Sequence, residues 1–345
     1  MYSVDKSDFK RFLKEFHNQI EESAAIINKT ALSVDPSRIS NLLYVGMGGS
    51  AIAGDLIKDI LFDSLKVPSN VVRGYLSPAY CAENTLVIAS SYSGNTEETL
   101  SAVESAGKKG AQVIVVTSGG KIKELAEKNG WSLIIIPQGY QPRQALGYIF
   151  FTLYHILGGA GLLSHYEKDL TYLVDAARHW AKAYDYPNST ASVLPFDMAN
   201  KIRGRIPIIY SSAPLLRTVG VRWRNQINEN AKSMAFSNAF PELNHNEIVG
   251  WECETNLGKN FIVILLENED PHPRIKKRIE ITKKVIKDKG VEVIDIYSAG
   301  KTPLEKVFSL IVLGDWVSYY LALAYKKDPI EIDNINYLKQ EMAKN

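Results

Sequence analysis

The chain of 345 residues is longer than one hydrophobic core usually serves, so two domains are expected. A hydrophobic share of 46% excludes general disorder, and a formal net charge of +2 gives no global field that favours nucleic acid or a membrane surface. The two cysteines, Cys81 and Cys253, cannot build a disulfide framework, and neither stands in a metal-ligand spacing.

Two stretches bear on where the protein resides. Residues 1–14 are charged and lack an apolar run, so no signal peptide is expected. Residues 145–163 are mostly apolar, but polar side chains and three glycines near the end interrupt them, which favours a buried core helix over a membrane span. We therefore expect a cytoplasmic protein.

The first half of the chain alternates short apolar runs with helical patterns. A helical pattern over 4–28 comes first, and β-rich runs follow at 42–45, 67–72, 86–89, 113–116 and 133–136. Helices are expected between them, at about 51–62 and 97–109, and from the glycines at 119 and 120 to residue 128. Strands alternating with helices predict a doubly wound α/β fold, in which helices cover both faces of a parallel sheet. Residues 140–184 are predicted to be helical, with a break at 158–161.

The second half repeats this order of elements. Residues 185–190 are the best linker candidate, which predicts domains at 1–184 and 185–345. Strands are expected at 206–210, 261–266 and 291–295, and helices at 217–235, 273–289, 303–325 and 330–344. Two halves with a similar element order suggest an internal duplication.

A glycine turn follows the first strand, in the run Gly46-Met47-Gly48-Gly49-Ser50-Ala51. Glycines allow backbone N–H groups to approach a ligand closely, and the N-terminus of the next helix favours an anion. We therefore expect a negatively charged group to bind at Gly48, Gly49 and Ser50. The run also fits the dinucleotide fingerprint, and Arg73 after the second strand would suit an NADP 2′-phosphate, so an oxidoreductase stays a candidate.

A second loop favours a single phosphate. Ser91, Ser93 and Thr96 crowd the turn between the third strand and its helix, with Gly94 among them. Hydroxyl groups and unpaired N–H groups at a helix start make a compact phosphate cup. The alternative is an ordinary helix start capped by Thr96, which is the more common role for that residue alone but leaves Ser91 and Ser93 unexplained.

The run Ser91-Tyr92-Ser93-Gly94-Asn95-Thr96-Glu97-Glu98-Thr99 resembles the sugar isomerase (SIS) domain, a flavodoxin-like module that binds phosphosugars. The whole chain resembles the archaeal-type bifunctional phosphoglucose/phosphomannose isomerases, which carry two such domains. Further matching segments run through both halves in the family's order: Gly46 to Ser50, Pro142-Arg143-Gln144-Ala145-Leu146-Gly147, Asn225 to Lys232, and Leu243-Asn244-His245-Asn246-Glu247. The set is specific, whereas any one of these segments alone would not be.

The resemblance implies a reaction and residues for it. It implies reversible isomerisation of glucose 6-phosphate and mannose 6-phosphate to fructose 6-phosphate through a cis-enediol, a step of glycolysis and gluconeogenesis that needs no metal or redox cofactor. Glu229 matches the family's proton-transferring base. On pattern alone, a solvated glutamate paired with Lys232 or Arg224 is the more ordinary interpretation of that residue.

Three further residues take roles from the same resemblance. His245 matches the histidine that assists ring opening and is supplied by the partner subunit, which implies a homodimer. Arg143, expected at a helix start, matches the group that stabilises the enediolate, the alternative being a solvent-bound arginine. Lys339 matches a C-terminal lysine that helps to open the ring, although its local motif is short.

A regulator of a different class remains an alternative, because SIS modules also serve as non-catalytic sugar-phosphate sensors. A sensor needs the phosphate cup but not Glu229 or His245, and it usually carries a DNA-binding segment. No basic helix-turn-helix pattern stands in this sequence, so no nucleic-acid partner is expected. The run Ser211-Ser212-Ala213-Pro214 replaces the glycine turn in the second half and is not expected to bind phosphate.

Overall fold

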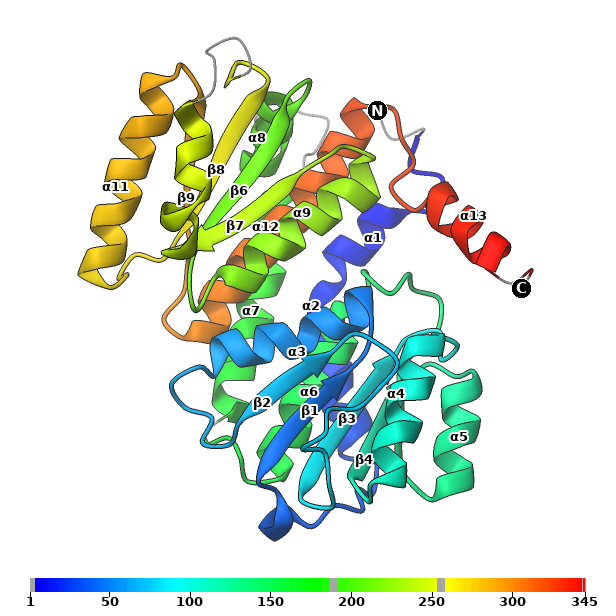
Figure 1. Cartoon of the computed structure of the whole chain (residues 1–345). Coiled ribbons are helices and arrows are strands. Elements are labelled where there is room, and N and C mark those ends of the chain that lie inside the picture. Colours follow the sequence, from blue (N-terminus) through cyan, green and yellow to red (C-terminus); the bar gives the residue numbers. More distant parts are fainter. Residues whose placement is uncertain (1–3, 165, 186–191, 253–257, 343, 345) are drawn as a thin grey trace. The chain divides into compact units, whose positions relative to one another are not determined.

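A computed structural model describes residues 4–164, 166–185, 192–252, 258–342 and 344 of the chain (Figure 1). These residues fall into two compact units. The sheet A unit comprises Glu15–Arg178 with Thr302–Glu305, and the sheet B unit comprises Met1–Lys14, His179–Lys301 and Lys306–Asn345. The predicted boundary at residues 184 and 185 stays a prediction.

Sheet A has five parallel strands in the order β2-β1-β3-β4-β5. This is the flavodoxin-like order, which confirms the predicted fold class. The central strand β3 is buried along its whole length, as expected for a strand covered on both faces. The strands span Asn41–Val45 (β1), Ser69–Val72 (β2), Thr85–Ser91 (β3), Gln112–Thr117 (β4) and Ser132–Ile135 (β5).

Alternate side chains of these strands enter two different layers. Leu43 and Val45 join a core with the inner faces of α4 (Glu97–Lys108) and α5 (Lys121–Asn129). Tyr44 points the other way and packs on α3 (Gly48–Ile60), where a Cβ on Gly54 would lie 2.7 Å from the Tyr44 Cβ. Helices α2 (Phe16–Ile27) and α6 (Leu146–Gly159) pack against each other, and α6 also contacts α3.

Sheet B has four parallel strands in the order β7-β6-β8-β9, which repeats the order of the first four strands of sheet A. The strands span Ile206–Ser212 (β6), Phe236–Phe240 (β7), Phe261–Glu267 (β8) and Glu292–Tyr297 (β9). Helix α9 (Arg217–Ala231) contacts β6 and β7, and the inner side chains of α11 (Pro273–Asp288) join Tyr210 and Leu265 in a core on the sheet. The remaining elements include α1 (Phe9–Lys14), α7 (Tyr166–Tyr184), α8 (Leu194–Ile202), α12 (Pro303–Ala324) and α13 (Asp333–Met342), with 3-10 turns at Pro36–Arg38, Glu242–His245 and Glu247–Glu252.

Four sequence expectations need correction. The helical pattern over 4–28 is two helices, α1 and α2, and the pattern over 217–235 ends at Ala231, before the unpredicted strand β7. Residues 140–145 form turns before α6 begins, and the sequence pattern gave no sign of α8. The linker candidate lies outside the described residues except for Asp185.

The apolar stretch at 145–163 is the core helix that was expected, because α6 is buried from Leu146 to Leu157. Among the described residues, α12 is the helix whose length and composition would allow it to cross a membrane, and 94% of its most apolar window is buried. Core helices pass the same test, so α12 is weak support for a membrane span.

Candidate active site

The crevice at the carboxyl ends of β1 and β3 is where this fold places a ligand. The chain leaves β1 toward β2 on one side and leaves β3 toward β4 on the other, which makes the pair a topological switch point. The glycine turn follows β1, and the hydroxyl-rich loop follows β3. Strand pairing therefore brings the two predicted anion-binding segments to one edge of sheet A.

The glycine turn starts α3 directly. Gly48 is the first helical residue and has φ +50°, a backbone conformation that favours glycine. The first N–H groups of a helix lack partners within it, so Gly48 and Gly49 offer donors at this edge. Gly49 also packs closely on the chain before α6, because an added Cβ would lie 2.9 Å from the Pro142 oxygen and 3.1 Å from the Arg143 nitrogen.

The residues of the predicted phosphate cup, called the cup below, lie together at the end of β3. Ser91 is buried and donates from its Oγ to Thr96 Oγ1 over 3.2 Å, whereas Ser93 is exposed. Thr96 occupies the N-cap position of α4, but its side chain makes no capping hydrogen bond. The capping interpretation of Thr96 is therefore wrong for its hydroxyl group, which faces Ser91 instead.

The loop after β4 holds this cup in shape. Gly94 has φ +71°, and an added Cβ would lie 1.7 Å from the Gly119 oxygen, so only glycine fits there. The Ile122 N–H donates to the Gly94 oxygen over 2.9 Å, and the Lys121 N–H donates to Asn95 Oδ1 over 3.1 Å. The cup loop is thus tied to the start of α5.

Arg143 lies beside the glycine turn. It stands in a turn three residues before α6 and not in the helix itself, and it is only 4% exposed. The solvent-bound alternative is therefore wrong. A guanidinium this deeply buried needs compensating polar or anionic groups.

Glu229 lies near the end of α9, on a partly buried position. The neighbouring face of α9 is polar but buried, and it bonds to α12. Arg222 pairs with Asp315 over 2.7 Å, Gln226 donates to the same carboxylate over 2.9 Å, and Asn230 donates to Ser318 over 2.9 Å. These bonds fix the rotation of α9 and hence the direction of Glu229.

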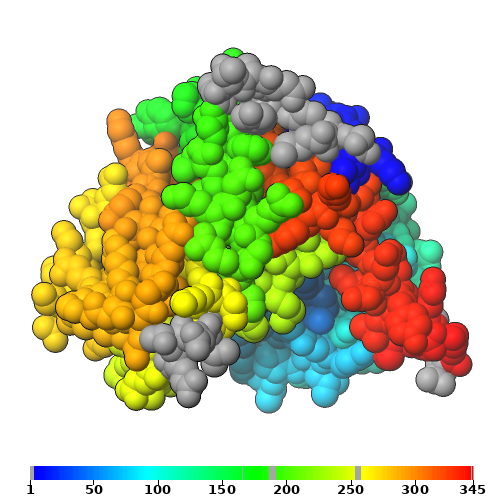
Figure 2. All heavy atoms as spheres, turned by 90° about the horizontal axis from the view of Figure 1, so that it is seen from above, coloured from blue at the N-terminus to red at the C-terminus, as the bar shows by residue number. Residues whose placement is uncertain are grey.

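His245 and Lys339 are exposed residues of the sheet B unit. His245 ends the 3-10 turn that follows β7. Lys339 stands on α13, a helix with no buried residue, whose red atoms lie at the surface in Figure 2. Both side chains are therefore accessible from solvent in the single chain.

The structure therefore brings part of the predicted site together. The glycine turn, the cup and Arg143 meet at one edge of the sheet A unit, whereas Glu229, His245 and Lys339 belong to the sheet B unit. Sequence reasoning missed Tyr92, which lies inside the serine-rich run and bonds to the start of α3 and to the loops after β4 and β5. Its position between two predicted ligand serines was the available signal.

The structure bears on one alternative, the NADP interpretation of the glycine turn. Arg73, the candidate for an NADP phosphate, forms an ion pair with Asp55 on α3, which gives it a local partner. Within the described ranges, no group of three or more histidine, cysteine, aspartate or glutamate side chains is placed to hold a metal ion.

The carboxyl ends of the strands in sheet B differ in charge from those in sheet A. Strand β8, which corresponds in order to β3, ends at the buried Glu267, whereas β3 ends in serines. Burial and the neighbouring Asp295 raise the pKa of Glu267. The expectation that the run Ser211-Ser212-Ala213-Pro214, after β6, does not bind phosphate stays a prediction.

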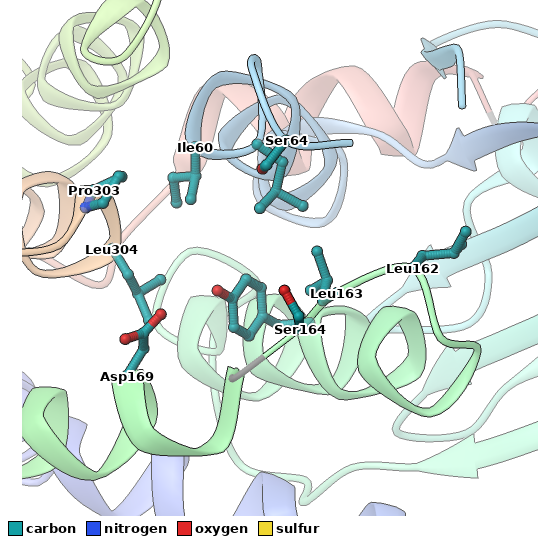
Figure 3. Close-up of a pocket in the computed structure, with 10 residues that line it drawn as sticks. Ile60, Ser64, Leu162, Leu163, Ser164, Asp169, Pro303 and Leu304 are labelled. Atoms are coloured by element: carbon teal, nitrogen blue, oxygen red, sulfur yellow. The ribbon is translucent and has the colours of Figure 1, made fainter. Parts of the chain in front are cut away.

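The pocket in Figure 3 is a different feature of the sheet A unit. It has a volume of about 200 Å³ and lies at Ile60 and Leu61, with Leu163, Asp169 and Leu304 around it. Ile60 and Leu61 stand at the C-terminal end of α3, about 18 Å along the helix from the glycine turn. The pocket is therefore separate from the switch-point site.

Two family models match the chain. The SIS domain matches residues 37–136, and the bacterial phospho-glucose isomerase C-terminal SIS domain matches residues 195–342. A hypothetical protein from Thermus thermophilus has the same fold, with a TM-score of 0.74 and 17% identity over 100% of this chain and 89% of that one. The two family matches support the SIS interpretation of both sheets.

Curated relatives cover most of the chain. A bifunctional phosphoglucose/phosphomannose isomerase from Caldicellulosiruptor bescii is 42% identical over 94% of this chain and 96% of its own. A D-glucosamine-6-phosphate 4-epimerase from Sulfolobus acidocaldarius is 39% identical over 66% of this chain and 69% of its own. Near-complete coverage at this identity shows common descent, and the chain belongs to the family of bifunctional phosphoglucose/phosphomannose isomerases.

Proposed function

We propose that this protein is an aldose–ketose isomerase that converts glucose 6-phosphate and mannose 6-phosphate reversibly to fructose 6-phosphate. The observation that carries the proposal is the hydroxyl-lined cup at the switch point. The chain is also 42% identical to a curated bifunctional phosphoglucose/phosphomannose isomerase. A sugar phosphate has one dianionic group, and the cup offers hydroxyl and N–H donors for one such group.

The reaction divides into four tasks. Ser91, Ser93 and Thr96, with the backbone of Gly48 to Ser50, hold the phosphate. His245 and Lys339 assist opening of the sugar ring. Glu229 removes the proton from C2 of the aldose and returns it to C1, and Arg143 stabilises the oxygens of the enediolate formed between the two steps.

Partners and setting complete the proposal. We infer a homodimer in which His245 reaches the site of the partner subunit, supported by the exposure of His245 and of Val249, which is 59% exposed in the following turn. The proton moves through protein groups without a metal, and the enzyme acts in the cytoplasm in glycolysis and gluconeogenesis. The proposed domains are 1–184 and 185–345.

Loss of the base tests the proposed chemistry. Glu229→Gln removes the proton acceptor and keeps the shape, so we expect kcat to fall by ~10²–10⁴-fold. Exchange of the C1 hydrogen of fructose 6-phosphate in deuterium oxide, followed by NMR, should fall with it, while binding of the sugar phosphate stays measurable by calorimetry.

The control makes the same substitution elsewhere. Glu280 is an exposed glutamate of the sheet B unit, paired with Lys277 over 3.6 Å. Glu280→Gln should retain full exchange. Unchanged exchange in Glu229→Gln would show that Glu229 is not the base. The absence of exchange in the unmodified protein would contradict the proposed isomerase activity.

A further inference from the structure

Near the cup, Tyr92 contacts the start of α3, which follows β1, and the loops that follow β4 and β5 of sheet A. Its N–H donates to Ser50 Oγ over 3.3 Å, after β1, and its carbonyl oxygen accepts from the Ser118 N–H (3.1 Å) and Ser118 Oγ (2.6 Å), after β4. Its side chain reaches the loop after β5. The residue is only 7% exposed and sits between the cup residues Ser91 and Ser93.

The Tyr92 hydroxyl bridges two backbone groups. It donates to the Pro137 oxygen over 2.8 Å and accepts from the Tyr140 N–H over 2.9 Å. Burial raises the pKa of Tyr92, so the hydroxyl keeps the proton that it donates. One oxygen atom therefore fixes both ends of the segment 137–140.

That segment leads directly to Arg143. The Gln141 N–H donates to Gln144 Oε1, and the Gln144 N–H donates to the Gln141 oxygen, each over 2.8 Å, which closes the turn that holds Arg143. Gln19 Nε2 donates to the Gln144 oxygen over 2.8 Å and anchors the far side of the turn. On the near side, the Tyr92 hydroxyl connects the segment to the cup.

We propose that Tyr92 is a positioning residue that aligns the Arg143 turn with the phosphate cup. The inference rests on the proposed function, because it concerns the guanidinium that stabilises the enediolate. Removing the hydroxyl would leave the backbone of Tyr92, and hence the cup, in place, since its bonds to Ser50 and Ser118 do not involve the side chain. It would free the segment that sets Arg143.

Two ligands separate these effects. Sorbitol 6-phosphate carries the phosphate but has no planar pair of oxygens, whereas 5-phosphoarabinonohydroxamate has a planar oxygen pair that resembles the enediolate. Tyr92→Phe should bind sorbitol 6-phosphate within about twofold of the unmodified protein and lose about tenfold or more in affinity for the hydroxamate. It should also lower kcat by ~10–100-fold with KM nearly unchanged, because a misplacement of about 1 Å has effects of that size.

The matched control is a buried tyrosine on β1, the strand that pairs with β3. Tyr44 is 2% exposed, and its hydroxyl has no hydrogen-bond partner among the described residues. Tyr44→Phe should change neither affinity. Equal losses for both ligands in Tyr92→Phe, or no loss for either, would overturn the inference, whereas failure of the unmodified protein to prefer the hydroxamate would instead overturn the proposed enediolate chemistry.

Discussion

Ser93 shows how a single side chain can contribute to binding without contributing to the fold. It is exposed, and its Oγ accepts one long bond, 3.4 Å, from the Asn95 N–H. Its replacement should therefore have little effect on stability. In the proposed site its hydroxyl group contacts the phosphate, which keeps the same charge in substrate and transition state.

The Ser93→Ala variant should raise KM several-fold and leave kcat within about twofold, because it removes binding energy that ground and transition states share. Steady-state kinetics on fructose 6-phosphate measure both constants. Ser64→Ala is the matched control, since Ser64 is an exposed serine at the opposite end of α3, beside the separate pocket. A large fall in kcat at constant KM would mean that the cup is not a phosphate site.

At the scale of elements, the contact between α9 and α12 is held by buried polar bonds. Trp223 Nε1 donates to the Leu310 oxygen over 2.8 Å, and the Arg222–Asp315 pair lies nearby with side chains 4% and 11% exposed. A buried ion pair contributes little to stability over an apolar pair, but losing one partner leaves an uncompensated charge. Its value is that it fixes one rotation of the helix that carries Glu229.

This predicts non-additive effects on stability. Arg222→Met and Asp315→Leu should each lower the free energy of unfolding by ~3–5 kcal/mol, and the double variant should lose much less than the sum. Urea denaturation of the four proteins measures the coupling. Glu21→Gln, which breaks the exposed Arg178–Glu21 pair of 2.8 Å, should cost about 1 kcal/mol or less. Additive losses at Arg222 and Asp315 would contradict the coupling.

The elements also show where sequence reasoning succeeds and fails. The strands of sheet A were predictable because apolar runs end in glycine or serine turns, and β3 is buried throughout. Strand β7 was missed because Phe236-Ser237-Asn238-Ala239-Phe240 is a short edge strand whose first residue is exposed, so its pattern is weak. The turn before α6 was missed because Pro142 is tolerated in the first turn of a helix. In the structure Gln144 instead bonds to the Gln141 backbone and closes a turn.

At the scale of the whole molecule, the predicted site is divided between two units. The chemistry of the cup could be predicted from its hydroxyls and glycines, because these act locally. The roles of Glu229, His245 and Lys339 came from the family resemblance, since no local pattern distinguishes them from surface residues. The position of Tyr92 between two predicted ligand serines was visible in the sequence, but its proposed role was not, because that role depends on loops that meet only in the folded sheet.

Subunit mixing tests the proposed homodimer. Glu229→Gln and His245→Ala homodimers should each be nearly inactive. If His245 acts on the site of the partner subunit, a mixed dimer has one of its two sites with both residues intact. Random pairing of the two kinds of subunit makes about half of the dimers mixed, so mixing and exchange should restore up to about a quarter of the activity. If both residues act within one subunit, mixing should restore nothing.

Product analysis tests the central claim most directly. The purified protein is incubated with fructose 6-phosphate and EDTA, and the products are followed by NMR. We predict that glucose 6-phosphate and mannose 6-phosphate both appear, because proton return to either face of a planar enediolate gives the two C2 epimers. Unchanged fructose 6-phosphate, or a product altered only at C4, would contradict the proposed isomerase.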